Sequence, residues 1–120
     1  MIKKLSSSVV KRSPCPVSTV LDLVGDKWTL LIIRDIGLFA PHRNKDFQQG
    51  VERITRNILA SRLKMLLENN LIHKRPYQNN PLRHEYFLTE AGEDLLPVVK
   101  AMAKWEKAHV AGSIMPRRLE

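Results

Sequence analysis

The chain has 120 residues, the size of one domain that can bury a core of its own. It is 43% hydrophobic and 27% charged, and it contains no run of about 18 apolar residues that would predict a membrane-spanning helix. Lys and Arg number 20 against 12 Asp and Glu, and the resulting formal charge of +8 is typical of a protein that binds a polyanion.

The start of the chain, M-I-K-K-L-S-S-S-V-V, lacks an apolar stretch long enough for a signal peptide. The single cysteine excludes a framework of internal disulfides. We therefore expect a cytoplasmic protein. Residues 1–14 are polar and basic and are predicted to form a flexible arm, residues 15–111 the folded domain, and residues 112–120 a frayed tail.

Cys15 lies between Pro14 and Pro16, with Lys11 and Arg12 upstream. Positive charge and a helix N-terminus both favour a reactive thiolate, so Cys15 is a candidate redox sensor. A disulfide would have to join two chains or one chain and a small thiol. The alternative is a small apolar residue packed at a contact between two chains.

The first helix is predicted to begin at Pro16, which suits a first helical position, and to end at Gly25. Asp26 is expected to cap a second helix over Lys27–Ile36. The inward residues of the two helices are Val17, Val20, Leu21, Val24, Trp28, Leu31, Ile32 and Ile36. Lys27 lies in the first turn of the second helix, where a helix N-terminus attracts phosphate.

A short connection over 38–43 leads to a third helix, Lys45–Val51, which Asn44 is expected to cap and which turns Phe47 and Val51 inward. The fourth helix is predicted from Thr55, as its cap, to Asn69 and Asn70. Its apolar stripe is formed by Ile58, Leu59, Leu63, Leu66 and Leu67. Two helices joined by a brief turn, the second polar on its outer face, predict a helix-turn-helix.

The polar face of the fourth helix suggests contact with DNA. Arg and Asn side chains make bidentate hydrogen bonds to guanine and adenine, so Arg56, Asn57 and Ser61 are the candidates for reading base edges. The candidates for phosphate or flanking contacts are Lys27, Lys45, Thr55, Arg62, Lys64, Gln78, Asn79, Asn80 and Arg83. Arg62 is ambiguous, since it could also brace the third helix. The alternative for the whole face is an ordinary solvated helix surface.

Two strands are predicted next, over Leu71–Pro76 and Arg83–Leu88, with a turn-rich loop over 77–82 between them. Such a basic hairpin could act as a DNA-binding wing with Gln78, Asn79 and Asn80 at its tip, or it could simply cover the core.

The last helix is expected to start at a Thr89 cap and to be kinked at Pro97. Its apolar residues occupy more than one face, so one face must be buried against something else, most simply a second copy of the chain. The residues predicted at this dimer interface are Val17, Val20, Leu21, Leu95, Val99, Met102 and Trp105. Arg117 and Arg118 in the tail could contact phosphate.

Motifs for catalysis or metal binding are absent from the sequence. His42, His73, His84 and His109 have no partners at metal-ligand spacing, and there is neither a Gly-rich phosphate loop nor a G-x-S-x-G motif. We therefore predict a protein that is not an enzyme and that uses no cofactor and no metal.

Several motifs in this order resemble the HxlR-type winged-helix transcriptional regulators, relatives of the MarR group. They are C-P-V at 15–17, D-x-x-G-D-K-W-T-L-L-I-x-R-D at 22–35, E-R-I-T-R-N-I-L-A-S-R-L at 52–63 and P-x-R-x-E-Y-x-L-T at 81–89. The resemblance implies a homodimer formed through the first and last helices, a helix from Thr55 in the major groove and a wing near Asn79 and Asn80 at the minor groove. It also implies that Cys15 occupies the position through which some members sense quinones, aldehydes or oxidants.

The expected fold is mainly α with a small β-hairpin wing, an α+β winged helix-turn-helix with dimerisation helices at both ends. The expected function is sequence-specific regulation of transcription by a homodimer on a double-stranded, pseudo-palindromic operator, with half-sites roughly 34 Å apart. Two alternatives stay open: a winged-helix module that binds an acidic protein, and an architectural DNA binder without sequence preference. The sequence identifies no small-molecule effector.

Overall fold

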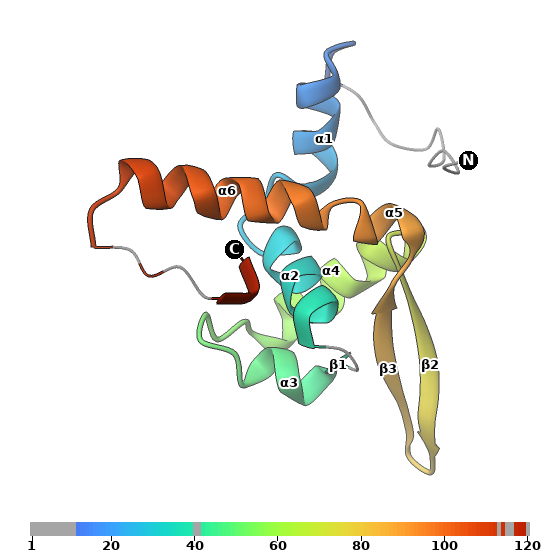
Figure 1. Ribbon diagram of the computed structural model, residues 1–120. Coiled ribbons are helices and arrows are strands. Elements are labelled where there is room, and N and C mark those ends of the chain that lie inside the picture. The colour runs from blue at the N-terminus through green and yellow to red at the C-terminus, as the bar shows by residue number, and fades with distance from the viewer. Residues whose placement is uncertain (1–11, 40–41, 113, 115–116, 120) are drawn as a thin grey trace.

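The computed structural model describes residues 12–39, 42–112, 114 and 117–119, and Figure 1 shows their arrangement. The elements are α1 (Pro16–Val24), α2 (Thr29–Phe39), β1 (His42–Arg43), α3 (Asn44–Gln48), α4 (Arg56–Glu68), β2 (Ile72–Asn79), β3 (Leu82–Leu88), α5 (Glu90–Glu93), α6 (Leu96–His109) and the 3-10 turn η1 (Arg117–Leu119). This helix-rich chain with a small antiparallel sheet has the predicted winged helix-turn-helix fold. Most of the predicted arm, residues 1–11, lies outside the described ranges.

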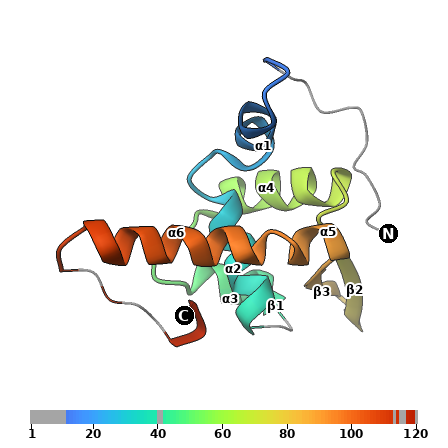
Figure 2. The ribbon, with the colours of Figure 1, turned by 45° about the horizontal axis from the view of Figure 1, so that its top comes forward.

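The core forms around α2, which is flanked by α4 on one side and α6 on the other (Figures 1 and 2). Ile32, Ile33 and Ile36 of α2 are almost fully buried. They share one cluster with the apolar stripe of α4 and with residues at the base of the sheet, namely Leu59, Leu63, Leu66, Leu71, Ile72 and Tyr86. None of the helices in the described ranges is long and apolar enough to cross a membrane.

The predicted helix ends are largely confirmed. Gly25 caps the C-terminus of α1, where a Cβ atom would lie only 2.2 Å from the carbonyl oxygen of Leu21. Thr55 accepts a hydrogen bond from the Ile58 N–H at 3.4 Å and so caps α4. After α4 ends, Asn70 adopts a φ of 61°, a left-handed conformation that Asn tolerates well. The second helix differs, because it runs from Thr29 to Phe39 rather than over Lys27–Ile36.

The third helix is shorter than predicted. It begins at Asn44 itself, and Arg43 stands in the capping position, with its backbone N–H donating to Oδ2 of Asp46 at 2.9 Å. The prediction that Asn44 caps this helix is therefore wrong. Phe47 is buried as expected, but Val51 is 93% exposed, because the helix ends at Gln48 and the chain turns before it reaches Val51.

The sheet contains three antiparallel strands in the order β1-β3-β2. The two-residue strand β1 was not predicted, because a pattern so short carries no periodicity. The predicted loop over 77–82 is also mostly wrong, since β2 continues to Asn79 and β3 starts at Leu82. A shift in register between Pro76 and Gln78 leaves Tyr77 without a directly opposed residue.

The predicted kink at Pro97 does not occur. The chain forms two helices instead, and Pro97 lies in the first turn of α6, where its missing N–H would have had no partner within the helix. The Thr89 cap is confirmed, since the Thr89 hydroxyl accepts a hydrogen bond from the Gly92 N–H at 3.2 Å at the start of α5.

Candidate nucleic-acid interface

The outer face of α4 is polar and exposed. Arg56, Asn57, Ser61 and Lys64 are all exposed, and the small residue Ala60 lies between them. In the described part of the chain, no carboxylate lies within ion-pair distance of Arg56 or Lys64. These side chains are therefore available for an outside partner.

Two ion pairs hold α4 and the turn before it against α2. Nε of Arg62 lies 3.1 Å from Oδ2 of Asp26, and the guanidinium of Arg34 donates two hydrogen bonds to the carboxylate of Glu52 at 3.1 and 3.0 Å. Arg62 therefore braces α4 against the start of α2, rather than against the third helix. Its guanidinium is already paired, which makes it a weaker phosphate candidate than Lys64.

The Asp26 carboxylate joins these elements and is stabilised in its charged form. It accepts hydrogen bonds from the backbone N–H of Trp28 at 3.0 Å and of Thr29 at 3.1 Å, and from the Thr29 hydroxyl. Partial burial on its own would raise the pKa of Asp26. The hydrogen bonds from Thr29 and Trp28 and the charge of Arg62 outweigh burial and lower this pKa.

The carboxylates around Arg34 titrate differently from one another. The hydrogen bond from Arg34 lowers the pKa of Glu52. Burial raises the pKa of Asp35, although Nε of Arg34 donates to its carboxylate at 2.8 Å. Arg34 thus links α2 to the turn that precedes α4 through two hydrogen bonds to Glu52.

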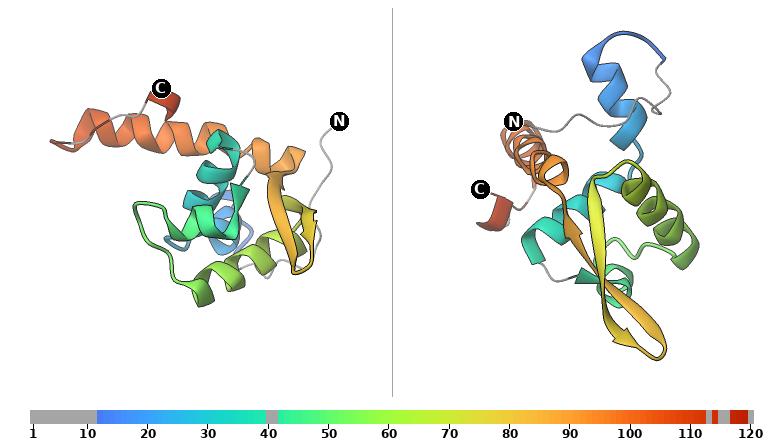
Figure 3. Two further views of the ribbon diagram at one scale, coloured as in Figure 1. Left: turned by 90° about the horizontal axis from the view of Figure 1, so that it is seen from below. Right: turned by 90° about the vertical axis from the view of Figure 1, so that its right-hand side faces the viewer.

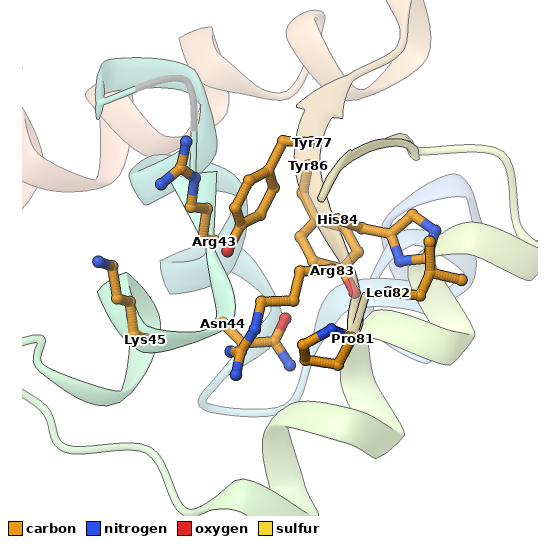
Figure 4. Close-up of a pocket in the computed structure, with 9 residues that line it drawn as sticks. All are labelled: Arg43, Asn44, Lys45, Tyr77, Pro81, Leu82, Arg83, His84 and Tyr86. Carbon is orange, nitrogen blue, oxygen red and sulfur yellow. The ribbon is translucent and has the colours of Figure 1, made fainter. Parts of the chain in front are cut away.

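A pocket of about 300 Å³, here called the wing pocket, lies between the start of α3 and the hairpin (Figure 4). It is lined by Arg43, Asn44, Lys45, Tyr77, Pro81, Leu82, Arg83, His84 and Tyr86. Its cationic side chains come from both sides, with Lys45 on α3 and Arg83 on β3, and both are exposed. This charge and this concave shape suit an anionic group.

Arg43 and Tyr77 form one wall of the wing pocket. The guanidinium of Arg43 stacks on the Tyr77 ring at 3.8 Å from its centroid and pairs with Glu85 at 3.2 Å. The sequence did not single out Arg43, Asn44 or Tyr77 as site residues. They come together through the pairing of β1 with β3 and the irregularity at Tyr77, and neither feature leaves a signal in a local pattern.

A groove of about 590 Å³ separates α4 from the sheet, and Lys64 and Lys74 both line it. The sequence placed Lys74 on a strand but not in the site. The wing projects beyond the body of the domain, as the right-hand view in Figure 3 shows. At its tip Asn79 and Asn80 are exposed, and Gln78 donates a hydrogen bond from Nε2 to the Pro81 carbonyl at 3.2 Å.

Two further predicted site residues, Lys27 and Cys15, lie outside α3, α4 and the wing. Lys27 is exposed at the start of the α2 region, with its Nζ 5.3 Å from the centroid of the Trp28 ring. Cys15 is an exposed free thiol at the N-cap of α1. In the described residues, no group of three or more His, Cys, Asp or Glu side chains is arranged to hold a metal ion.

The predicted interface residues fall into two groups. Val17, Val20, Leu21, Met102 and Trp105 are large apolar residues that remain exposed on α1 and α6. Val99 is buried and Leu95 packs against the core of the same chain, because α6 turns one apolar stripe toward α2. These two residues therefore do not lie on the exposed apolar surface.

Comparison with known proteins identifies helix-turn-helix regulators as relatives of this chain. The HxlR-like helix-turn-helix family model matches residues 23–113. An uncharacterized HTH-type transcriptional regulator of Mycobacterium tuberculosis is 43% identical over 89 residues, which is 74% of this chain and 55% of that protein. The chain thus spans about half the length of this relative. The uncharacterized HTH-type transcriptional regulator YdzF of Bacillus subtilis is 30% identical over 85% of this chain and 94% of its own.

Solved structures with the same fold include a MarR-family protein of Porphyromonas gingivalis W83 and the oxidized form of the redox regulator HypR. The first has a TM-score of 0.71 and 32% identity, covering 84% of this chain and 98% of its own. The second has a TM-score of 0.70 and 30% identity, covering 79% of this chain and 97% of its own.

Proposed function

The chain belongs to the HxlR-like helix-turn-helix family, and on that premise we propose that it is a homodimeric regulator of transcription that binds a specific DNA operator. The observation that carries the proposal is the exposed polar face of α4, which is flanked by the cations of α3 and the wing. The relatives named above are described as HTH-type transcriptional regulators, which agrees with this role.

In the proposed complex, α4 lies in the major groove. Arg56 and Asn57 lie in its first turn and are the residues assigned to base edges, with Ser61 one turn further on. The small side chains of Ala60 and Ser61 allow the helix to approach the bases closely. Thr55 is already engaged as the cap of α4, so its contribution to DNA contact is to fix the first turn.

Phosphate groups are assigned to the cations beside α4. Lys45 and Arg83 hold one phosphate at the wing pocket, and Lys64 and Lys74 face the backbone along the groove beside α4. Asn79 and Asn80 at the tip of the wing reach the flanking minor groove. Lys27, in the turn before α2, is also assigned to a DNA phosphate.

The homodimer is assigned to α1 and α6. Each leaves a row of large apolar side chains exposed, including Leu21 at 53% and Trp105 at 62%, and a second copy of the chain would bury both rows. A two-fold axis between two α4 helices then requires half-sites about one helical turn, roughly 34 Å, apart.

Selection from a random duplex library tests the proposal. We expect enrichment of a pseudo-palindrome with half-sites centred about 10 base pairs apart. If the protein retains duplexes from the library but enriches no sequence among them, the result would favour an architectural binder. Failure to retain DNA at physiological salt would favour a module that uses its basic face on an acidic protein.

We propose in addition that Cys15 is the site at which oxidants act on the regulator. The thiol is exposed at the N-cap of α1, the helix assigned to the dimer, and one structural neighbour is the redox regulator HypR, solved in its oxidized form. Two Cys15 thiols would lose two electrons and two protons to an oxidant such as diamide and form one intermolecular disulfide. We expect diamide to release the unmodified protein from its operator. If Cys15→Ser leaves this release unchanged, the assignment fails.

A further inference from the structure

A second pocket, here called the tail pocket, shares no residue with the wing pocket or with the groove beside α4. It lies between the C-terminal half of α2, the turn after α3 and the 3-10 turn η1, and its volume is about 710 Å³. Sites for small organic ligands commonly fall between about 300 and 1,000 Å³. The tail pocket is therefore large enough for a small organic ligand, and the DNA-binding role assigns it no function.

The lining of the tail pocket combines apolar surface with an excess of carboxylates. Leu38, Phe39 and Leu119 supply apolar surface, and the Phe39 side chain is 50% exposed. Three carboxylates but only two guanidinium groups line the same space. One of the two guanidinium groups, that of Arg34, is already shared between Asp35 and Glu52. The chain has a formal charge of +8, whereas the acidic and basic side chains that line this pocket give a local excess of negative charge.

A cation of the chain itself already sits against this lining. The guanidinium of Arg118 donates a hydrogen bond from Nη1 to the Leu38 carbonyl at 2.5 Å, and its Cζ lies 4.5 Å from the centroid of the Phe39 ring. The last carbonyls of a helix carry partial negative charge, and an aromatic face attracts cations. The end of α2 is therefore built to receive positive charge next to an apolar surface.

We propose that the tail pocket binds lipophilic organic cations, with their aromatic or aliphatic surface against Phe39 and Leu119 and their positive charge attracted by the end of α2 and the carboxylates. Such a ligand competes with Arg118 for the ring face of Phe39. It also contacts the turn Gly50–Glu52, which leads into α4 and which Arg34 ties to α2. The proposal does not depend on DNA binding, because ligand binding to the tail pocket is measured on the protein without DNA.

Calorimetric titration of the full chain with tetraphenylphosphonium tests the proposal, and tetraphenylborate, which has the same shape and the opposite charge, is the matched probe. Phe39→Leu keeps apolar bulk but removes the ring, so we expect it to weaken phosphonium binding by about threefold to tenfold. Arg118→Gln removes the competing cation and should tighten binding by about threefold or more on the same physical grounds. Both side chains are exposed, so neither change threatens the fold.

Lys104→Gln is the control, because it removes one positive charge from an exposed position on α6 outside the tail pocket. We expect it to change phosphonium affinity by less than about twofold, as a distant charge is screened by salt. The proposal is overturned if phosphonium does not bind at millimolar concentration. It is also overturned if Phe39→Leu and Arg118→Gln behave like the control, or if borate binding responds to these variants in the same way as phosphonium binding.

Discussion

Arg56 and Lys64 lie on the same exposed face of α4, about two helical turns apart, and we assign them different tasks. Arg56→Ala should weaken binding to the selected operator by about 1–3 kcal/mol of binding free energy. It should change the affinity for a scrambled duplex only slightly. Lys64→Ala should weaken both duplexes alike and reduce the slope of log affinity against log salt by about one. Fluorescence anisotropy over a series of salt concentrations measures both effects.

Each variant removes one positive charge from α4, so a difference between the two variants cannot come from the loss of charge alone. An equal loss on operator and scrambled DNA for Arg56→Ala would show that this residue holds phosphate. The base-reading role would then belong to Asn57 and Ser61 alone.

Asp26→Asn should cost stability in a way that depends on pH. Asn caps a helix as well as Asp does, so the substitution removes mainly the charge that Arg62 and the backbone N–H groups stabilise. The pKa of Asp26 is lowered in the folded state, so this stabilisation is complete above the unfolded pKa of about 3.9 and is lost as pH falls through the folded pKa. We expect a deficit of about 1 kcal/mol in the free energy of unfolding at pH 7.

Urea unfolding of both proteins at pH 7, 5 and 3 measures this deficit. It should be constant between pH 7 and 5 and should shrink toward pH 3. A deficit of the same size at all three pH values would mean that the carboxylate charge does not stabilise the junction of α2 and α4.

Residues whose roles are local were predictable from the sequence. Thr55 and Thr89 cap their helices through a backbone N–H only three residues away, so the sequence itself brings the partners together. The contact of Arg62 with Asp26 joins α4 to the turn before α2, and the stacking of Arg43 on Tyr77 joins β1 to β2. Such contacts depend on how the elements pack, which no local pattern encodes.

At the level of elements, α1 and α6 present apolar faces that the rest of the chain does not cover. Leu21→Asp and Trp105→Glu should each convert the proposed dimer into monomers, because each places a charge in an interface of apolar side chains. Light scattering after size-exclusion chromatography measures the mass directly.

Val51→Asp is the matched control, because Val51 is 93% exposed but lies outside α1 and α6. It should leave the mass unchanged. A wild-type chain that is monomeric at about 100 μM, far above the Kd of a stable dimer, would contradict the assignment. A Leu21→Asp variant that stays dimeric would exclude α1 from the interface.

Long elements with a strong period were predicted, and short or interrupted ones were not. The stripe of α4 fixed which of its faces is buried, and Leu59, Leu63 and Leu66 are all buried. Strand β1 has two residues and exists only because β3 lies beside it. Pro97 is compatible with both a kink and a helix start, and the placement of α5 decides between them.

At the level of the whole molecule, the charge of +8 is not spread evenly. Lys45, Lys64, Lys74 and Arg83 lie along α4, the wing pocket and the groove between them. The tail pocket carries an excess of carboxylates instead. Composition predicted a polyanion as the partner. Both the face that we propose for it and the carboxylate-rich tail pocket could be located only from the fold.

The central claim is that the exposed face of α4 reads DNA sequence. The most direct test is fluorescence anisotropy at near-physiological salt with two labelled duplexes of equal length, the selected operator and a scrambled version of it. We predict a preference for the operator of about 10³-fold or more, together with affinity that falls by about 0.9 log units per phosphate contact for each log unit of salt. Equal affinity for the two duplexes would contradict the claim.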